Sequence, residues 1–206
     1  MDPSVPPAVP IGNTYDKYAS RHPIERRLMQ GFFTALDASL PRHRPTRVLE
    51  VGVGEGEVAH RVSERWPGVP YTGIDLPDAG LAESWRREGL VGSFADIVQL
   101  PFADHMFDLI LAIEVLEHVR DPDGALRELR RVASGRLVLS VPREPIWRIA
   151  NLARGQYVRS LGNTPGHLNH WSARAFARLV ERHFALDAVH RPFPWTMAVA
   201  HPREPG

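Results

Sequence analysis

Apolar runs with the length of a β-strand recur along the chain, separated by stretches long enough to form a helix. Five such runs lie at 47–54, 70–75, 90–97, 107–115 and 136–142. Two more extended runs, "FALDAVH" (184–190) and "WTMAVA" (195–200), flank the turn "RPFP" near the end. The pattern predicts a series of strands that closes with a hairpin.

Amphipathic stretches lie between these runs. After Pro23, apolar residues at helical spacing form one face, consisting of Leu28, Phe32, Phe33, Leu36 and Leu40. A further helix is predicted to follow the strand at 47–54 and to end at about Trp66, and others are predicted at 79–88, 122–133 and 172–183. Asp121, just before Pro122, and Ser172 are predicted N-caps.

Strands that alternate with helices predict an α/β fold, in which a mainly parallel sheet carries helices on both faces. Ligands of such sheets bind beyond the carboxyl ends of the strands. Residues 1–12 are rich in proline and are predicted to form a flexible tail, followed by a single domain at 13–206. The long connection 143–171 is predicted to be an insertion or lid on the acceptor side.

The composition narrows the class of protein. The 206 residues are 43% hydrophobic and 24% charged, include no cysteine, and carry a formal net charge of +1. These values fit a globular domain without disulfides or thiolate sites, and they disfavour nucleic acid as a partner. The first residues lack a signal-peptide pattern, and no apolar run reaches the ~20 residues of a membrane span. We therefore expect a cytoplasmic enzyme or binding domain.

The stretch "LEVGVGEGEV" places Gly52, Gly54 and Gly56 between a strand and a helix. Glycines there allow a tight turn and close approach of a ligand to the backbone. A dinucleotide fingerprint, G-x-G-x-x-G, requires its last glycine at position 57, where this chain has Glu57. This spacing disfavours an NAD-dependent oxidoreductase.

Carboxylates follow three of the predicted strands. Glu50, before the glycines, suits a cationic amino-acid group better than a pyrophosphate. Asp75, at the end of the second strand, can accept two hydrogen bonds from a ribose diol. Asp96 can accept a hydrogen bond from the exocyclic amine of adenine, with Ile97 as an apolar contact beside it.

Together, "VLEVGVGEGEV", "YTGIDL" and "GSFADIVQLPFADHMFDLILAIEVLEHV" resemble the successive motifs of class I S-adenosylmethionine-dependent methyltransferases, over roughly residues 46–142. The resemblance implies a Rossmann-like seven-stranded sheet of order 3-2-1-4-5-7-6 with the last strand antiparallel. It also implies that S-adenosylmethionine is bound by Glu50, Gly52, Gly54, Gly56, Asp75, Leu76, Asp96, Ile97 and Glu114.

The segment "EVLEHV" follows the fourth strand with two glutamates and a histidine. If a helical turn begins at Glu114, Glu117 and His118 share its face and form half of a divalent-metal site. The pattern resembles metal-dependent O-methyltransferases that act on the terminal 2′-hydroxyl of small RNAs or on phenols in ubiquinone biosynthesis. By that resemblance the metal ligands, for Mg, Mn, Co, Fe or Zn, are Glu114, Glu117, His118 and His167.

Two alternatives to a metal stay open for this segment. His118 could be a base or an acceptor contact without a metal, with His170 as another candidate base. The segment could also serve only to cap local structure.

The connection 143–171 alternates apolar residues with arginines in its first part, up to residue 161. It could cover a small acceptor, lie on a membrane surface beside a lipid-linked acceptor, or bind phosphates. We expect a methyltransferase that acts on a hydroxyl of a small-molecule or lipid-like acceptor, with an RNA 2′-O-methyltransferase as an alternative. A non-enzyme alternative is an inactive partner subunit that binds S-adenosylmethionine. The sequence gives no oligomeric state.

Overall fold

A computed structural model describes residues 23–155 and 157–203 of the protein. The helices are α1 (Pro23–Ser39), α2 (Glu57–Arg65), α3 (Ala79–Glu88), α4 (Pro122–Val132), α5 (Ile146–Ala153) and α6 (Ala173–Glu181), with 3₁₀ turns η1 (Leu116–His118) and η2 (Val158–Ser160). The strands are β1 (Val48–Val51), β2 (Tyr71–Asp75), β3 (Gly92–Phe94), β4 (Phe107–Ile113), β5 (Ala133–Pro142), β6 (Phe184–His190) and β7 (Trp195–Pro202). The proline-rich tail predicted at 1–12 lies outside the described residues.

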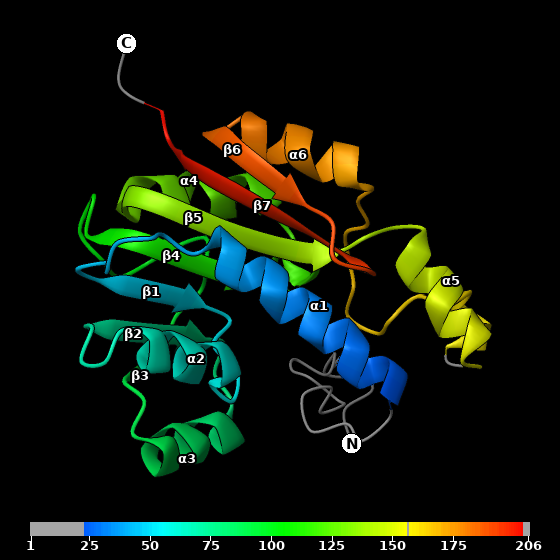
Figure 1. Ribbon diagram of the computed structural model, residues 1–206, viewed down its shortest axis with the longest axis horizontal. Coiled ribbons are helices and arrows are strands. Elements are labelled where there is room, and N and C mark those ends of the chain that lie inside the picture. Colours follow the sequence, from blue (N-terminus) through cyan, green and yellow to red (C-terminus); the bar gives the residue numbers. More distant parts are fainter. Residues whose placement is uncertain (1–22, 156, 204–206) are drawn as a thin grey trace, which may run out of the picture.

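The strands form one seven-stranded sheet of order β3-β2-β1-β4-β5-β7-β6 (Figure 1). Strands β1 to β5 pair in parallel, whereas β7 pairs antiparallel with both β5 and β6. The predicted Rossmann-like methyltransferase sheet, including its antiparallel last strand, is therefore confirmed. The closing hairpin predicted at 184–190 and 195–200 corresponds to β6 and β7.

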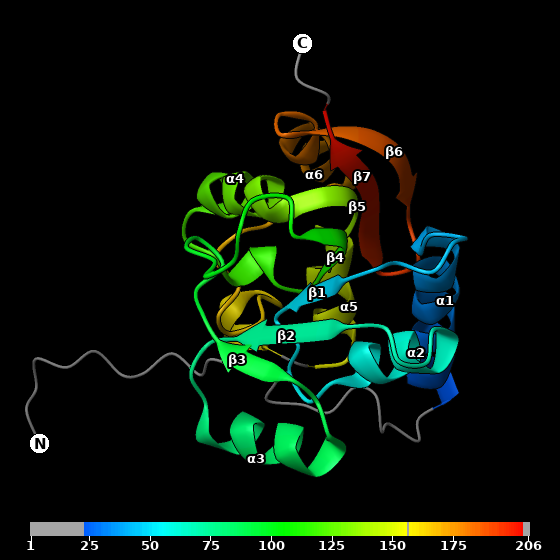
Figure 2. The ribbon, with the colours of Figure 1, turned by 90° about the vertical axis from the view of Figure 1, so that its left-hand side faces the viewer.

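Helices cover both faces of this sheet (Figure 2). On one face, α1 and α2 bury Phe32, Leu36 and Val62 against the central strands. On the other, α4 and α6 bury residues such as Leu129 and Phe176. Strand β4 is covered on both faces. Its sequence, "FDLILAI", is therefore a nearly continuous apolar run and does not alternate between apolar and polar residues.

Local capping agrees with the sequence at two helices. The Asp121 side chain accepts a hydrogen bond from the N–H of Gly124 at the start of α4, and Ser172 Oγ accepts one from Ala175 at the start of α6. Both side chains satisfy an N–H group that lacks a partner within its helix.

The structure differs from the expected boundaries at two functional segments. Strand β1 ends at Val51, because Gly52 already has a positive φ of 72° that a strand cannot continue. The helical turn expected to begin at Glu114 begins instead at Leu116, since Glu114 has a left-handed φ of 59°. Among the described residues, no helix combines the length and apolar character needed to cross a bilayer.

Candidate functional site

A cleft of about 2820 Å³ opens beyond the carboxyl ends of β1, β2 and β4. Ligand pockets of roughly 300–1,000 Å³ are usual, so this cleft has room for a nucleoside cofactor and an acceptor side by side. It is lined by all but one of the predicted site residues, namely Glu50, Gly52, Gly54, Gly56, Asp75, Leu76, Asp96, Ile97, Glu114, Glu117, His118 and His167. The exception, His170, is not among the residues that line it.

The glycine loop contributes an open backbone surface to the cleft. At Gly52, an added Cβ would lie 2.3 Å from Val115 Cγ2, so this glycine permits close packing within the protein. At Gly54, with φ of 52°, an added Cβ would meet no protein atom within 4 Å. Gly54 therefore leaves space on the cleft side, as the close approach of a ligand requires.

The carboxylate of Asp75 is fixed at the end of β2 by the backbone. The N–H of Gly54 donates to Oδ2 at 2.8 Å, and the N–H of Leu76 donates to Oδ1 at 2.7 Å. Each carboxylate oxygen can accept more than one hydrogen bond, so both can still receive a donor from the cleft. This geometry suits the ribose-diol role predicted for Asp75.

Glu50 is almost completely buried in β1, with 2% of its surface exposed. The hydroxyl of Tyr71 in β2 donates a hydrogen bond to its carboxyl group. Burial, opposed in part by that hydrogen bond and assisted by the charge of Asp75, raises the pKa of Glu50 from 4.5 to about 8. A cation in the cleft would stabilise the ionised form, which fits the predicted contact with a cationic amino group.

Tyr71 was not predicted as a site residue. Glu50 pairs with Gly73 across β1 and β2, which leaves Tyr71 at the diagonal position two residues earlier. Diagonal neighbours on one sheet face are within reach of long side chains. The register of β1 against β2 would have revealed this contact, but a single sequence does not fix that register.

Asp96 and Ile97 follow β3 at the edge of the cleft. The N–H of Val98 donates to Asp96 Oδ1 at 3.1 Å, which closes a local turn. Ile97 is buried and belongs to the core. The turn thus places a carboxylate and an apolar wall together, as predicted for an adenine contact.

Glu117, His118 and His167 come together in the cleft from two separate segments. Each offers one ligand atom, and these three atoms lie within 4.8 Å of one another. The imidazole rings of His118 and His167 meet edge to face, with centroids 4.8 Å apart. One carboxylate and two imidazoles are a donor set suited to a divalent transition metal.

Backbone contacts hold the two segments together. The N–H groups of Leu168 and Asn169 both donate to the carbonyl of Glu117, at 2.8 and 3.0 Å. The side-chain amide of Asn169 donates to the carbonyls of Leu116 and Val119. Asn169, which the sequence did not indicate, therefore fixes the loop that carries His167 against η1.

His118 is oriented by the same loop. Its Nδ1 lies 3.0 Å from the carbonyl oxygen of Gly166. Because a carbonyl can only accept, Nδ1 carries a proton, and in the neutral ring Nε2 then carries the lone pair. This tautomer supplies the nitrogen needed by either a metal ligand or a base.

Two predicted members of the chemical site lie apart from this cluster. The left-handed backbone of Glu114 directs its carboxylate to Trp195 Nε1 at 2.8 Å and Ser140 Oγ at 3.2 Å. His170 Nε2 lies 2.6 Å from Asn163 Oδ1. The four predicted metal ligands are thus not brought together as one set, and the close group contains three of them.

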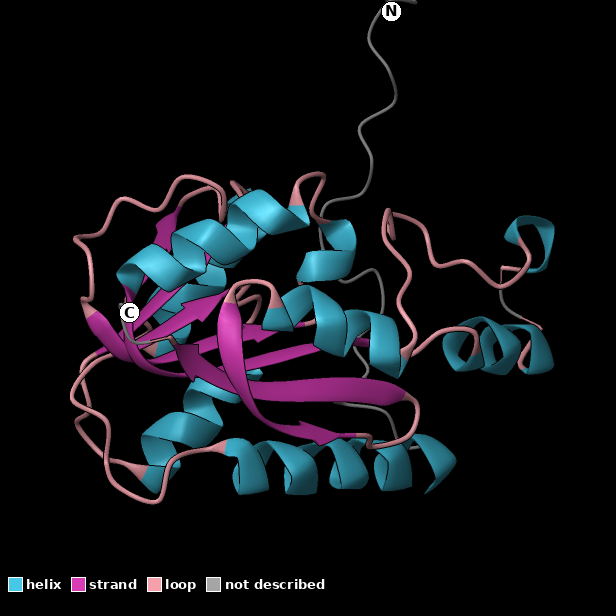
Figure 3. Ribbon diagram, turned by 90° about the horizontal axis from the view of Figure 1, so that it is seen from above, coloured by secondary structure: helices cyan, strands magenta, loops and turns pink. Residues whose placement is uncertain are grey.

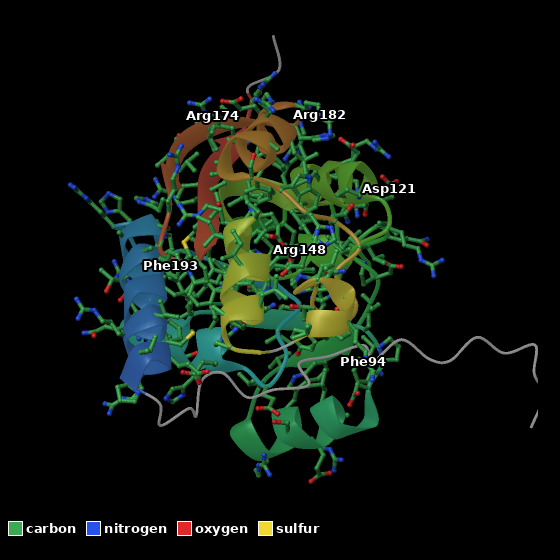
Figure 4. All side chains as sticks on the ribbon, turned by 90° about the vertical axis from the view of Figure 1, so that its right-hand side faces the viewer. Phe94, Asp121, Arg148, Arg174, Arg182 and Phe193 are labelled. Atoms are coloured by element: carbon green, nitrogen blue, oxygen red, sulfur yellow. The ribbon has the colours of Figure 1, made fainter. Side chains whose placement is uncertain are left out.

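The wall beside the cluster is aromatic. Trp147 lies nearly parallel to the His167 ring, with centroids 6.3 Å apart, and its centroid is 5.8 Å from that of Trp195. Phe193 also lines the cleft and is labelled near α1 in Figure 4. These side chains form an apolar surface next to the polar cluster.

Comparisons with known proteins show the family to which this chain belongs. A family model described as a methyltransferase domain matches residues 20–184. The chain is 34% identical over 124 residues to a malonyl-[acyl-carrier protein] O-methyltransferase of Geobacter sulfurreducens, covering 57% of this chain and 44% of that protein. It is 36% identical over 112 residues to a demethylmenaquinone methyltransferase of Thermus thermophilus, covering 51% and 50% respectively.

Solved structures share the fold at low identity. A protein from Pyrococcus horikoshii has a TM-score of 0.69 at 17% identity, covering 92% of this chain and 97% of its own. An S-adenosylmethionine-dependent methyltransferase from Mesorhizobium loti has a TM-score of 0.64 at 19% identity, covering 83% and 97%. The chain spans about half the length of the curated relatives it matches. The matched model covers most of this chain, which therefore belongs to the methyltransferase domain family and has the class I S-adenosylmethionine-dependent methyltransferase fold.

Proposed function

We propose that this protein transfers the methyl group of S-adenosylmethionine to a hydroxyl oxygen of a small-molecule or lipid-like acceptor. One observation carries the proposal: the glycine loop with its carboxylates shares a cleft with the cluster of Glu117, His118 and His167. The printed names of relatives include O-, N- and C-methyltransferases. The choice of oxygen therefore rests on the cluster and not on the relatives.

Methyl transfer is an in-line displacement. A lone pair of the acceptor oxygen forms a bond to the methyl carbon, the carbon–sulfur bond breaks, and S-adenosylhomocysteine leaves with the electron pair. Holding the two reactants in line can contribute roughly 7–11 kcal/mol to lowering the barrier. The backbone at Gly54 and the carboxylates of Glu50 and Asp75 would fix the donor for this step.

A neutral hydroxyl must also lose its proton. Glu117, His118 and His167 are the residues that would hold a divalent cation. When bound, such a cation supplies positive charge that lowers the pKa of the acceptor hydroxyl. Glu114 and His170 are not needed as ligands in this proposal, since their side chains lie elsewhere.

A second candidate mechanism needs no metal. The contact of His118 Nδ1 with Gly166 leaves the lone pair on Nε2, where it could accept the hydroxyl proton directly. His118 would then be the general base, and Glu117 and His167 would orient it or the acceptor.

Calorimetric titration with Mn²⁺, Co²⁺ and Zn²⁺ tests the metal proposal. Replacing His118 or His167 with Ala should lower cation affinity at least about tenfold, because even outer partners of metal ligands contribute that much. His170→Ala is the matched control and should bind the cation as the wild type does. Equal affinity in all four proteins would rule out the cluster as the metal site.

Turnover distinguishes the remaining possibilities. We expect formation of S-adenosylhomocysteine with a panel of phenolic and lipid-linked hydroxyl acceptors, and its loss after chelation. Activity that survives chelation but falls in His118→Ala would favour the metal-free base. Cofactor binding without turnover throughout the panel would favour an inactive partner subunit.

A further inference from the structure

The helix α5 and the turn η2 project from the body of the protein beyond the end of β5 (Figures 1 and 3). We refer to α5, η2 and the following Leu161 and Gly162 as the α5 arm. The side chain of Asn151 donates to the carbonyl of Gly162 at 2.9 Å, and Arg148 Nε donates to the carbonyl of Leu161 at 3.1 Å. The two parts of the arm are thereby held together as one unit.

Four large apolar side chains of this arm are exposed. The exposed fractions are 60% for Ile149, 40% for Leu152, 58% for Val158 and 67% for Leu161. Leu161 also has a left-handed φ of 52°, a conformation that L-residues other than glycine rarely adopt. Large exposed apolar side chains gathered on one projecting segment are typical of an interaction surface.

The charge of the segment is one-sided. From Pro145 to Trp171 the sequence contains Arg148, Arg154 and Arg159 but no Asp or Glu. Arg154 is paired with Glu25 of α1, with 3.4 Å between Nη1 and Oε1, which leaves Arg148 and Arg159 for an outside partner. Arg148 lies on α5, as labelled in Figure 4, and its guanidinium contacts the backbone of Leu161. Arginines beside exposed apolar side chains complement a surface that is negatively charged outside and apolar within.

The arm also borders the cleft. Ile149, Arg154 and Tyr157 line it, together with Trp147. An apolar molecule held at the outer surface of the arm would therefore lie next to the opening of the cleft.

We propose that the α5 arm docks on an anionic lipid bilayer, inserting Ile149, Leu152, Val158 and Leu161 among the lipids while Arg148 and Arg159 contact the headgroups. The docking itself does not require methyl transfer. Its consequence for the acceptor rests on the proposed function: a lipid-linked hydroxyl could enter the cleft from the bilayer without crossing water.

Co-sedimentation with lipid vesicles tests this proposal. The wild-type chain should bind vesicles that mix phosphatidylglycerol with phosphatidylcholine and bind pure phosphatidylcholine more weakly. Leu161→Glu and Val158→Glu, at two exposed residues that do not line the cleft, should each weaken binding at least about tenfold, since each removes an inserted apolar side chain and adds a repelled charge. Arg159→Glu should weaken binding to the mixed vesicles about fivefold or more.

Val91→Glu is the matched control, because Val91 is an equally exposed apolar residue, at 69%, that precedes β3 and lies outside the arm. It should bind the mixed vesicles like the wild type. The proposal is overturned if the wild type does not bind the mixed vesicles, which would be the result if another part of this chain covered the arm. It is also overturned if Leu161→Glu binds the mixed vesicles as tightly as the wild type.

Calorimetry of S-adenosylmethionine binding in the same variants separates the two proposals. If a variant loses vesicle binding but still binds the cofactor, the substitution has affected the docking surface of the arm and not the cofactor site. A wild-type chain that binds vesicles but not the cofactor would end the proposed function and leave the docking surface standing.

Discussion

At the scale of single residues, Glu50 combines burial in β1 with a position in the lining of the cleft. Its carboxyl group lies on a covered strand, where ionisation is unfavourable unless a cation lies beside it. The hydroxyl of Tyr71 favours the ionised form, and the nearby charge of Asp75 opposes it. With a pKa of about 8, the side chain is mostly protonated at neutral pH in the free protein.

Cofactor binding should therefore depend on pH. A bound ammonium group favours the carboxylate, so binding at pH 7 should release a proton from Glu50. Affinity should rise up to about tenfold per pH unit between pH 6 and 7, because the ionised fraction grows in that range. Calorimetry in buffers of different ionisation enthalpy measures the proton released. Glu50→Gln should abolish both effects, and an unchanged pH profile in that variant would remove Glu50 from the cofactor site.

The same group should affect stability without ligand. The folded-state pKa of Glu50 lies above its ordinary value of 4.5, so the unfolded chain loses its proton first as pH rises. The contribution of Glu50 to the free energy of unfolding should be fully present below pH 4.5 and decline until about pH 8. Urea unfolding at several pH values measures this slope. A slope in Glu50→Gln as steep as in the wild type would contradict the assignment.

At the scale of elements, one glycine in the loop between β1 and α2 can be compared with one that follows α5. Gly54 and Gly155 both have positive φ, 52° and 67°, and an added Cβ would meet no protein atom at either. Only Gly54 lines the cleft. Strain and ligand contact can therefore be tested independently.

Gly54→Ala and Gly155→Ala should each destabilise the protein by a similar amount, about 1–2 kcal/mol, because alanine is strained in the left-handed region. Only Gly54→Ala should also weaken S-adenosylmethionine binding, since its methyl group enters the space left for the ligand. Thermal unfolding and cofactor titration of both variants measure the two effects. Equal cofactor affinity in the two variants would show that the ligand does not approach Gly54.

The contact between η1 and the loop 166–169 brings His118 and His167 together. "EVLEHV" predicted a helical turn from Glu114, and the observed turn starts later because Glu114 adopts left-handed backbone geometry. The two segments are far apart in sequence and are joined by hydrogen bonds to Glu117, Leu116 and Val119. Local propensity contains no information on such a contact.

At the scale of the whole molecule, ligands that bind the folded state should stabilise it. A ligand at 100 times its dissociation constant contributes about 2.7 kcal/mol. S-adenosylhomocysteine and a divalent cation should each raise the melting temperature, because each would bind the folded state, the first at the glycine loop and the second at the cluster of Glu117, His118 and His167. In His167→Ala the shift with the cation should disappear while the shift with S-adenosylhomocysteine remains. Loss of both shifts would indicate damage to the fold, and persistence of the cation shift would place the metal elsewhere.

The sequence by itself determined the alternation of strands and helices, the caps at Asp121 and Ser172, and the glycine loop with its carboxylates. These features depend on periodicity, backbone sterics and short-range hydrogen bonds, which neighbouring residues specify. The ordered motifs added the strand order through resemblance, and the structure confirmed it.

Only the tertiary structure decided which of the predicted chemical residues meet. Glu117, His118 and His167 lie within 4.8 Å of one another, whereas Glu114 turns to Trp195 and His170 lies outside the cleft lining. It also joined Tyr71 to Glu50 and left the apolar side of the α5 arm exposed. The physical reason is that these contacts depend on strand register, on one left-handed residue and on long-range packing, none of which a single sequence specifies.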